Sequence, residues 1–176
     1  MTAKPRIVFS TFRSSTDPMF LSYARFNRVI GASVRRSTSS DAVAAPALVL
    51  GAEPAPGAAL CGVWRILATN NRELGRSARA YKSFEAARTH VLALQAEVDE
   101  LVTTSVSGGA PGMYGWFMSL RAVPVLTCGR WYGSAASGLE ASVALREALR
   151  GGELDVVARP VVAVRGGQAA PKELTW

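Results

Sequence analysis

The sequence predicts an α+β protein: an antiparallel β-sheet built from repeated hairpin-plus-helix units, with helices packed on one face. Short runs of alternating apolar residues, such as Trp64, Ile66 and Ala68, are typical of half-buried strands. Each pair of such runs is followed by an Ala-rich pattern with helical spacing. The same arrangement recurs along the chain, which indicates that one supersecondary unit is repeated.

The unit within residues 64–94 has all of its parts. Asn70 and Asn71 separate two alternating stretches and favour a tight hairpin turn, because Asn tolerates positive φ. Ser83 is a suitable N-cap for the helix that follows, whose apolar stripe includes Val91. A further extended run, ELVTTSVS, comes after the helix. We therefore expect a hairpin, a covering helix and one more strand.

A second copy begins at Trp116, which aligns with Trp64 of the first copy. With one residue of slippage, Ser134 aligns with Ser83, and another Ala-rich helix and extended run, ELDVVARPVVAV, follow. The run RAVPV replaces the Asn turn in this copy. We therefore expect Pro124 at a turn or at the edge of the sheet, since proline cannot donate to a central ladder.

A third, degenerate copy lies at the N-terminus. Placing Phe20 on Trp64 brings Asn27 onto Asn71, and Pro46 interrupts the helix that this copy would need. The chain is therefore expected to divide into a degenerate, mostly β unit, two intact units and a flexible tail, at residues 1–55, 56–110, 111–165 and 166–176.

The repeated unit resembles the YegP-like repeat, a small domain of unknown function. The resemblance is carried by Trp64, Ile66, Ala68, Asn70, Ser77, Tyr81, Ser83, Ala87, Val91 and Leu94. It covers residues 60–150 well and 18–50 faintly, and Asn71 departs from the family in standing where Gly is usual. The resemblance implies tandem units that form antiparallel strands under helices. Because the family has no established catalytic residues, it assigns none to this chain.

The residues needed for catalysis or metal binding are not grouped in the sequence. The single histidine, His90, lies inside a helical pattern, and the Gly-rich runs lack the Lys-Ser/Thr of a phosphate loop. The two cysteines, Cys61 and Cys128, are far apart and form no ligand cluster, so we expect two buried thiols in a reducing cytoplasm. No apolar run reaches the roughly 20 residues of a membrane span. We expect a non-enzymatic cytoplasmic protein without metal or cofactor.

The charge of the chain is strongly positive. Twenty Lys and Arg residues stand against 13 Asp and Glu residues, for a net charge of +7, and 17 of the cations are Arg. The first 60 residues hold seven cations and three anions, the largest local excess. Arginine suits phosphate through its bidentate fork, but a GC-rich genome also favours Arg over Lys. Both explanations of the charge remain open at this point.

Two binding functions follow from these patterns. Exposed sheet edges favour assembly with another protein chain or a second copy. Alternatively, a sheet face with cations and aromatic residues binds nucleic acid. Cations and aromatics on one exposed face favour nucleic acid, and scattered ones favour assembly. The candidate contact residues are Arg25, Arg28, Arg35, Arg36, Arg65, Arg79, Phe117, Arg121, Arg130 and Trp131.

Overall fold

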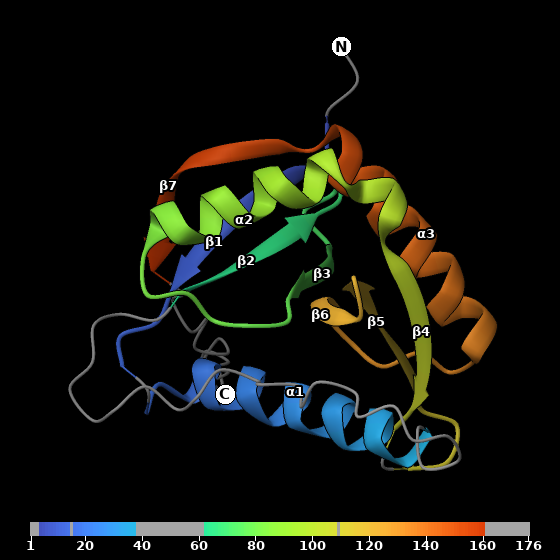
Figure 1. Ribbon diagram of the computed structural model, residues 1–176. Helices are drawn as coiled ribbons and strands as arrows, with labels where there is room; N and C mark the ends of the chain where they lie inside the picture. Colours follow the sequence, from blue (N-terminus) through green and yellow to red (C-terminus); the bar gives the residue numbers. More distant parts are fainter. Residues whose placement is uncertain (1–3, 15, 38–61, 109, 161–176) are drawn as a thin grey trace, which may run out of the picture.

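The α+β prediction is confirmed by a computed structural model that describes residues 4–14, 16–37, 62–108 and 110–160 (Figure 1). Three α-helices pack on an open, mostly antiparallel sheet with strand order β4-β5-β6-β3-β2-β1-β7. In chain order the elements are β1 (Arg6–Thr11), α1 (Pro18–Ser37), β2 (Gly62–Leu67), β3 (Glu73–Ser77), α2 (Phe84–Ala96), the 3₁₀ turn η1 (Val98–Glu100), β4 (Val102–Ser107), β5 (Tyr114–Leu120), β6 (Val123–Cys128), α3 (Ala135–Gly151) and β7 (Glu153–Pro160). Pro46, Cys61 and the predicted tail lie outside the described residues.

Two copies of one arrangement make up most of the sheet. The first is β2-β3-α2-β4 and the second is β5-β6-α3-β7. The copies meet at the centre of the sheet, where β3 and β6 pair antiparallel with Gly75 opposite Cys128. An approximate two-fold axis perpendicular to the sheet therefore relates them and places α2 and α3 on the same face. The last strand of the first copy, β4, pairs with β5 of the second.

Strand β1 breaks this internal symmetry. By symmetry β7 would pair with β2, but β1 lies between them, antiparallel to β2 and parallel to β7. The parallel pair is possible because β1 and β7 come from opposite ends of the described chain. The N-terminal strand thus completes the sheet built by the two copies.

The local turn and cap predictions are confirmed. Asn71 has φ of 61°, as a tight hairpin turn requires. The side chain of Ser83 accepts a hydrogen bond from the Ala86 N–H at 3.1 Å, and Ser134 caps α3 in the same way. Pro124 is the second residue of β6, next to the hairpin turn.

The mostly β prediction for the N-terminal unit is wrong over residues 18–37, which form the single helix α1. Phe20, Tyr23, Asn27 and Ile30 are buried, and their spacing of three or four residues is helical rather than the period of two of a strand. The Asp17 carboxylate accepts a hydrogen bond from the Met19 N–H at the start of the helix. The Asn27 match to the hairpin turn was coincidental.

Helix α1 also corrects the prediction that the helices share one face. It contacts the sheet through Tyr23 and Asn27 on the face opposite α2 and α3 (Figure 1). The face under α2 and α3 holds the larger core, in which Gly75 is required for close packing. A Cβ at Gly75 would lie 2.3 Å from Leu145 Cδ1 and 2.7 Å from the Thr127 carbonyl oxygen.

Among the helices that the structure describes, none has the length and apolar character of a membrane-spanning segment.

Candidate functional site

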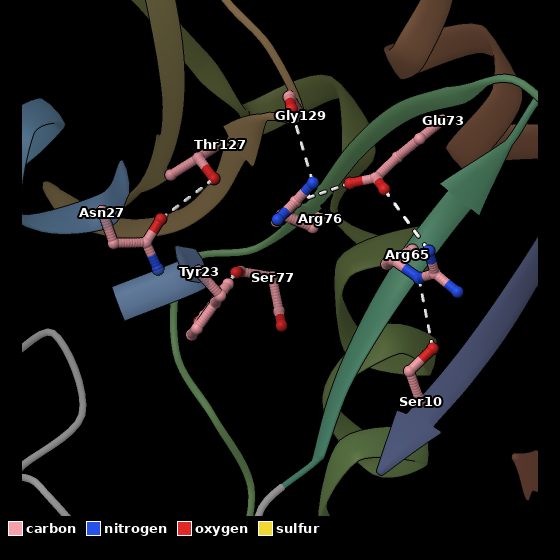
Figure 2. A network of polar contacts seen from close by, with 9 residues as sticks. All are labelled: Ser10, Tyr23, Asn27, Arg65, Glu73, Arg76, Ser77, Thr127 and Gly129. Carbon is pink, nitrogen blue, oxygen red and sulfur yellow. Dashed lines mark hydrogen bonds and ion pairs between the residues drawn. The ribbon is translucent and has the colours of Figure 1, made fainter. Parts of the chain in front are cut away.

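A network of two arginines and one glutamate lies on the sheet face that carries α1 (Figure 2). Arg65 of β2 and Arg76 of β3 are directly opposite each other. Glu73 joins them, with Oε1 2.5 Å from Arg76 Nε and Oε2 3.5 Å from Arg65 Nη1. A β-bulge between β2 and β3 allows Glu73 and Arg76, three residues apart, to share this face. Two like charges directly opposite destabilise a sheet, and Glu73 offsets that repulsion.

Further hydrogen bonds fix both guanidinium groups. Arg65 Nε donates to Ser10 Oγ of β1 at 3.1 Å, and Arg76 Nη2 donates to the Gly129 carbonyl oxygen at 3.3 Å. The Arg65 and Arg76 side chains are 33% and 20% exposed, so their charges reach solvent. Bonds to described residues leave Arg65 Nη2 and Arg76 Nη1 available as donors. The two guanidinium groups are therefore held in fixed positions, each with donors to spare.

A second network of the same composition adjoins the first. Asp155 of β7 accepts two hydrogen bonds from Arg6 Nη2, at 2.9 and 3.1 Å, and lies 3.5 Å from Arg159 Nη2. Arg159 is opposite Ser10, the residue that accepts from Arg65, so the networks meet across β1. Four guanidinium groups and two carboxylates therefore spread over β3, β2, β1 and β7.

Helix α1 covers the neighbouring part of this face. Tyr23 Oη donates to the Ser77 carbonyl oxygen at 3.1 Å, and Asn27 Nδ2 donates to the Ala78 carbonyl oxygen at 3.2 Å. Thr127 of β6 donates to Asn27 Oδ1 at 3.4 Å. Burial raises the pKa of Tyr23, so its hydroxyl remains a neutral donor. These bonds anchor a helix whose sequence contains four arginines and no acidic residue.

The two sides of the sheet carry different net charges. We call the described part of α1, its cap Asp17 and the two networks the basic face; their described side chains include six arginines and three acids, a net charge of +3. The opposite helical layer, residues 84–100 and 135–151, holds six acids and three arginines, and with Lys82 directly before α2 and Arg121, which pairs with Glu97 and Glu100, its net charge is −1. A composition bias alone gives no reason for this division. The described arginines of the basic face are Arg6, Arg25, Arg28, Arg65, Arg76 and Arg159.

Three of the predicted contact residues have described side chains on the basic face. Arg25 and Arg28 are exposed on α1, and Arg65 belongs to the first network; the side chains of Arg35 and Arg36 lie outside the described part of the structure. Arg6, Arg76 and Arg159 were missed. The alternation in the strands is the signal for Arg76, which shares a face with Arg65 once the strands are paired. The role of Asp155 had no local signal, because its partner Arg6 is 149 residues away.

The other predicted contact residues are dispersed. Arg79 and Arg130 stack over the rings of Tyr81 and Tyr132, at 5.2 and 5.0 Å from their centroids. Arg121 forms ion pairs with Glu97, the residue before η1, and with Glu100, the last residue of η1.

The two predicted aromatic contacts differ in exposure. Phe117 is only 6% exposed and belongs to the core, so its prediction as an exposed contact is wrong. Trp131 is partly buried and packs against Phe26 of α1, with 5.0 Å between ring centroids.

His90 is a packing residue of α2. Trp64 Nε1 donates to Tyr81 Oη at 3.2 Å, and Tyr81 Oη also forms a hydrogen bond with His90 Nδ1. Burial, aided by the positive charge of Arg79, lowers the pKa of His90 to about 4, so the imidazole is neutral at pH 7. The corresponding residue of the second copy is Ala141, and the fold needs no histidine there.

Chemically reactive groupings are not found among the described residues. No three His, Cys, Asp or Glu side chains in this part of the chain are placed to hold a metal ion. Cys128 is buried as predicted, and burial raises its thiol pKa to about 11, which keeps it protonated and unreactive. The site with the clearest ligand chemistry is the basic face.

Comparisons with protein-family models, with curated proteins and with solved structures give no match to this chain. The YegP-like resemblance therefore stays a prediction.

Proposed function

We propose that the protein is a non-catalytic module that binds duplex nucleic acid through phosphate contacts on its basic face. The observation that carries the proposal is the uneven distribution of charge, +3 on the described side chains of the basic face against −1 on the helical layer. A one-sided field of this kind raises the local concentration of an anionic polymer and orients its approach.

Arginine geometry supports phosphate as the group that is recognised. A guanidinium binds phosphate oxygens through a planar fork of donors. Ser10, Glu73 and the Gly129 carbonyl oxygen hold Arg65 and Arg76 in place before any ligand arrives. Less side-chain freedom is then lost on binding, which favours affinity.

Duplex is favoured over single strands because the predicted aromatic residues offer little surface for stacking. Proteins that hold single strands commonly stack bases on exposed aromatic rings. Phe117 is buried, and Trp131 is partly buried with its ring packed against Phe26. Contacts to phosphates alone carry no direct base readout, and we expect weak dependence on sequence.

The test is a fluorescence-anisotropy titration of the full chain with labelled probes of about 20 base pairs or nucleotides. Duplex DNA, duplex RNA and the corresponding single strands are compared at about 50 and about 200 mM salt. We expect micromolar duplex binding at the lower salt. Four phosphate contacts would weaken it roughly 100-fold at the higher salt.

Two results would count against the proposal. Tighter binding of single strands than of both duplexes would indicate base stacking rather than backbone contacts. No binding at the lower salt would mean that the charge segregation serves another partner.

A further inference from the structure

The two edges of the sheet differ in their openness to another strand. At the β7 edge, Ile7 is opposite Leu154 and Phe9 is opposite Ala158, so β7 carries two extra residues as a bulge. Asp155 and the following charged and proline residues also lie on this strand. Bulges, charges and proline are the features by which proteins prevent pairing at a sheet edge.

The β4 edge has none of these features. Its register with β5 is unbroken over all six residues, and the sequence VTTSVS contains no charge and no proline. Val102 is 61% exposed and Ser105 is exposed, whereas Val106 is only 3% exposed, so among the described residues the open length of the strand runs from Val102 to Ser105. A straight, uncharged edge strand is a ready template for strand addition.

We propose that two copies of the chain associate by antiparallel pairing of β4 with β4, centred on Thr104. In this register Thr104 is opposite its own copy, Thr103 is opposite Ser105, and the exposed Val102 is opposite Val106, which is buried in its own chain. The Thr–Thr and Thr–Ser pairs join side chains of the same kind and are favourable across strands. The self-complementarity of β4 is the reason that a second copy is the occupant.

This pairing places both basic faces on the same side of the dimer. Antiparallel neighbours in a sheet are related by a two-fold axis perpendicular to it, as β3 and β6 show within one chain. That internal axis puts α2 and α3 on one face, and an axis at β4 keeps α1 of both copies together on the other. The dimer then has a continuous sheet and one doubled basic face. The pairing is independent of the proposal for nucleic acid.

The test measures the mass of the full chain by sedimentation equilibrium, without nucleic acid, up to about 100 µM. We expect a dimer with twice the 18.6 kDa of one chain. Val102→Lys with Ser105→Lys puts charges on the β4 edge, and we expect the dimer to dissociate at least about tenfold more readily. The control, Val143→Lys with Ala144→Lys, adds the same charge to exposed positions of α3 and leaves the dimer intact.

Thermal unfolding of each variant separates loss of pairing from loss of fold. A wild-type chain that remains a monomer over this range overturns the proposal. A dimer that the β4 substitutions leave intact also overturns it, since another surface must then hold the copies together.

Discussion

At the scale of single residues, Glu73 explains how two arginines can face each other on neighbouring strands. Its carboxylate contacts Arg76 Nε at 2.5 Å and lies 3.5 Å from Arg65 Nη1. The basic face therefore keeps two guanidinium groups in fixed positions with an excess of one positive charge. A purely structural ion pair needs only one arginine, and the second is the feature that suits an external anion.

Replacing Glu73 should lower the stability of the fold and raise its affinity for duplex nucleic acid. We expect Glu73→Gln to lower the free energy of unfolding by about 1 to 2 kcal/mol, more at low salt, because Arg65 and Arg76 then repel each other. The same variant should bind duplex more tightly, since the basic face gains a charge while Ser10 and the Gly129 carbonyl oxygen still hold the two guanidinium groups in place. Urea unfolding and duplex titration measure the two effects. Glu140→Gln, at an exposed position of α3, should change neither, and weaker duplex binding by Glu73→Gln would oppose the account.

His90 makes stability depend on pH. Because the pKa of His90 is lowered to about 4 in the folded chain, from 6.5, the unfolded chain binds a proton that the folded chain does not between these values. Stability should therefore fall as the pH is lowered from 6.5 to 4, by about 1 to 2 kcal/mol after allowance for solvent screening. His90→Ala, which copies Ala141 of the second copy, should show a flatter stability profile by urea unfolding. An unchanged slope would show that carboxylates cause the effect.

At the scale of elements, local signals predicted the two repeated units but not α1. Turns and caps act within a few residues, so Asn71, Ser83 and Ser134 marked real boundaries. Residues 20–42 share residue types with the repeat but not its structure. The buried residues Phe20 and Tyr23 are instead spaced as in a helix. The spacing of apolar residues therefore predicts secondary structure better than an alignment of residue types, because the spacing reflects which side chains share a face.

Asn27 shows how α1 is attached to the sheet. Its side chain is 1% exposed and bonds the Ala78 carbonyl oxygen and Thr127. We expect Asn27→Ala to lower the free energy of unfolding by about 1 to 3 kcal/mol, because it leaves these buried groups without partners. Ser22→Ala, at an exposed position of the same helix, should stay within about 0.5 kcal/mol of wild type. Equal effects of the two substitutions in urea unfolding would mean that α1 is held by apolar packing alone.

At the scale of the whole molecule, the order of the strands determines which charged side chains lie together on one face of the sheet. The excess of arginine was visible in the sequence, but its segregation was not, since it depends on which face of the sheet α1 covers. Arg6 and Asp155 belong to opposite ends of the described chain and meet only because β1 is inserted beside β7. The composition therefore left open whether the charge had a function, and the topology favours one.

The most direct measurement is the salt dependence of duplex binding by two matched double variants. Arg25→Gln with Arg28→Gln removes two exposed charges from the basic face, and Lys82→Gln with Arg88→Gln removes two from the side of α2. We expect the first variant to reduce the slope of log affinity against log salt by about two, and the second to leave it unchanged. Equal reductions in both variants, or none in the first, would contradict phosphate binding by the basic face.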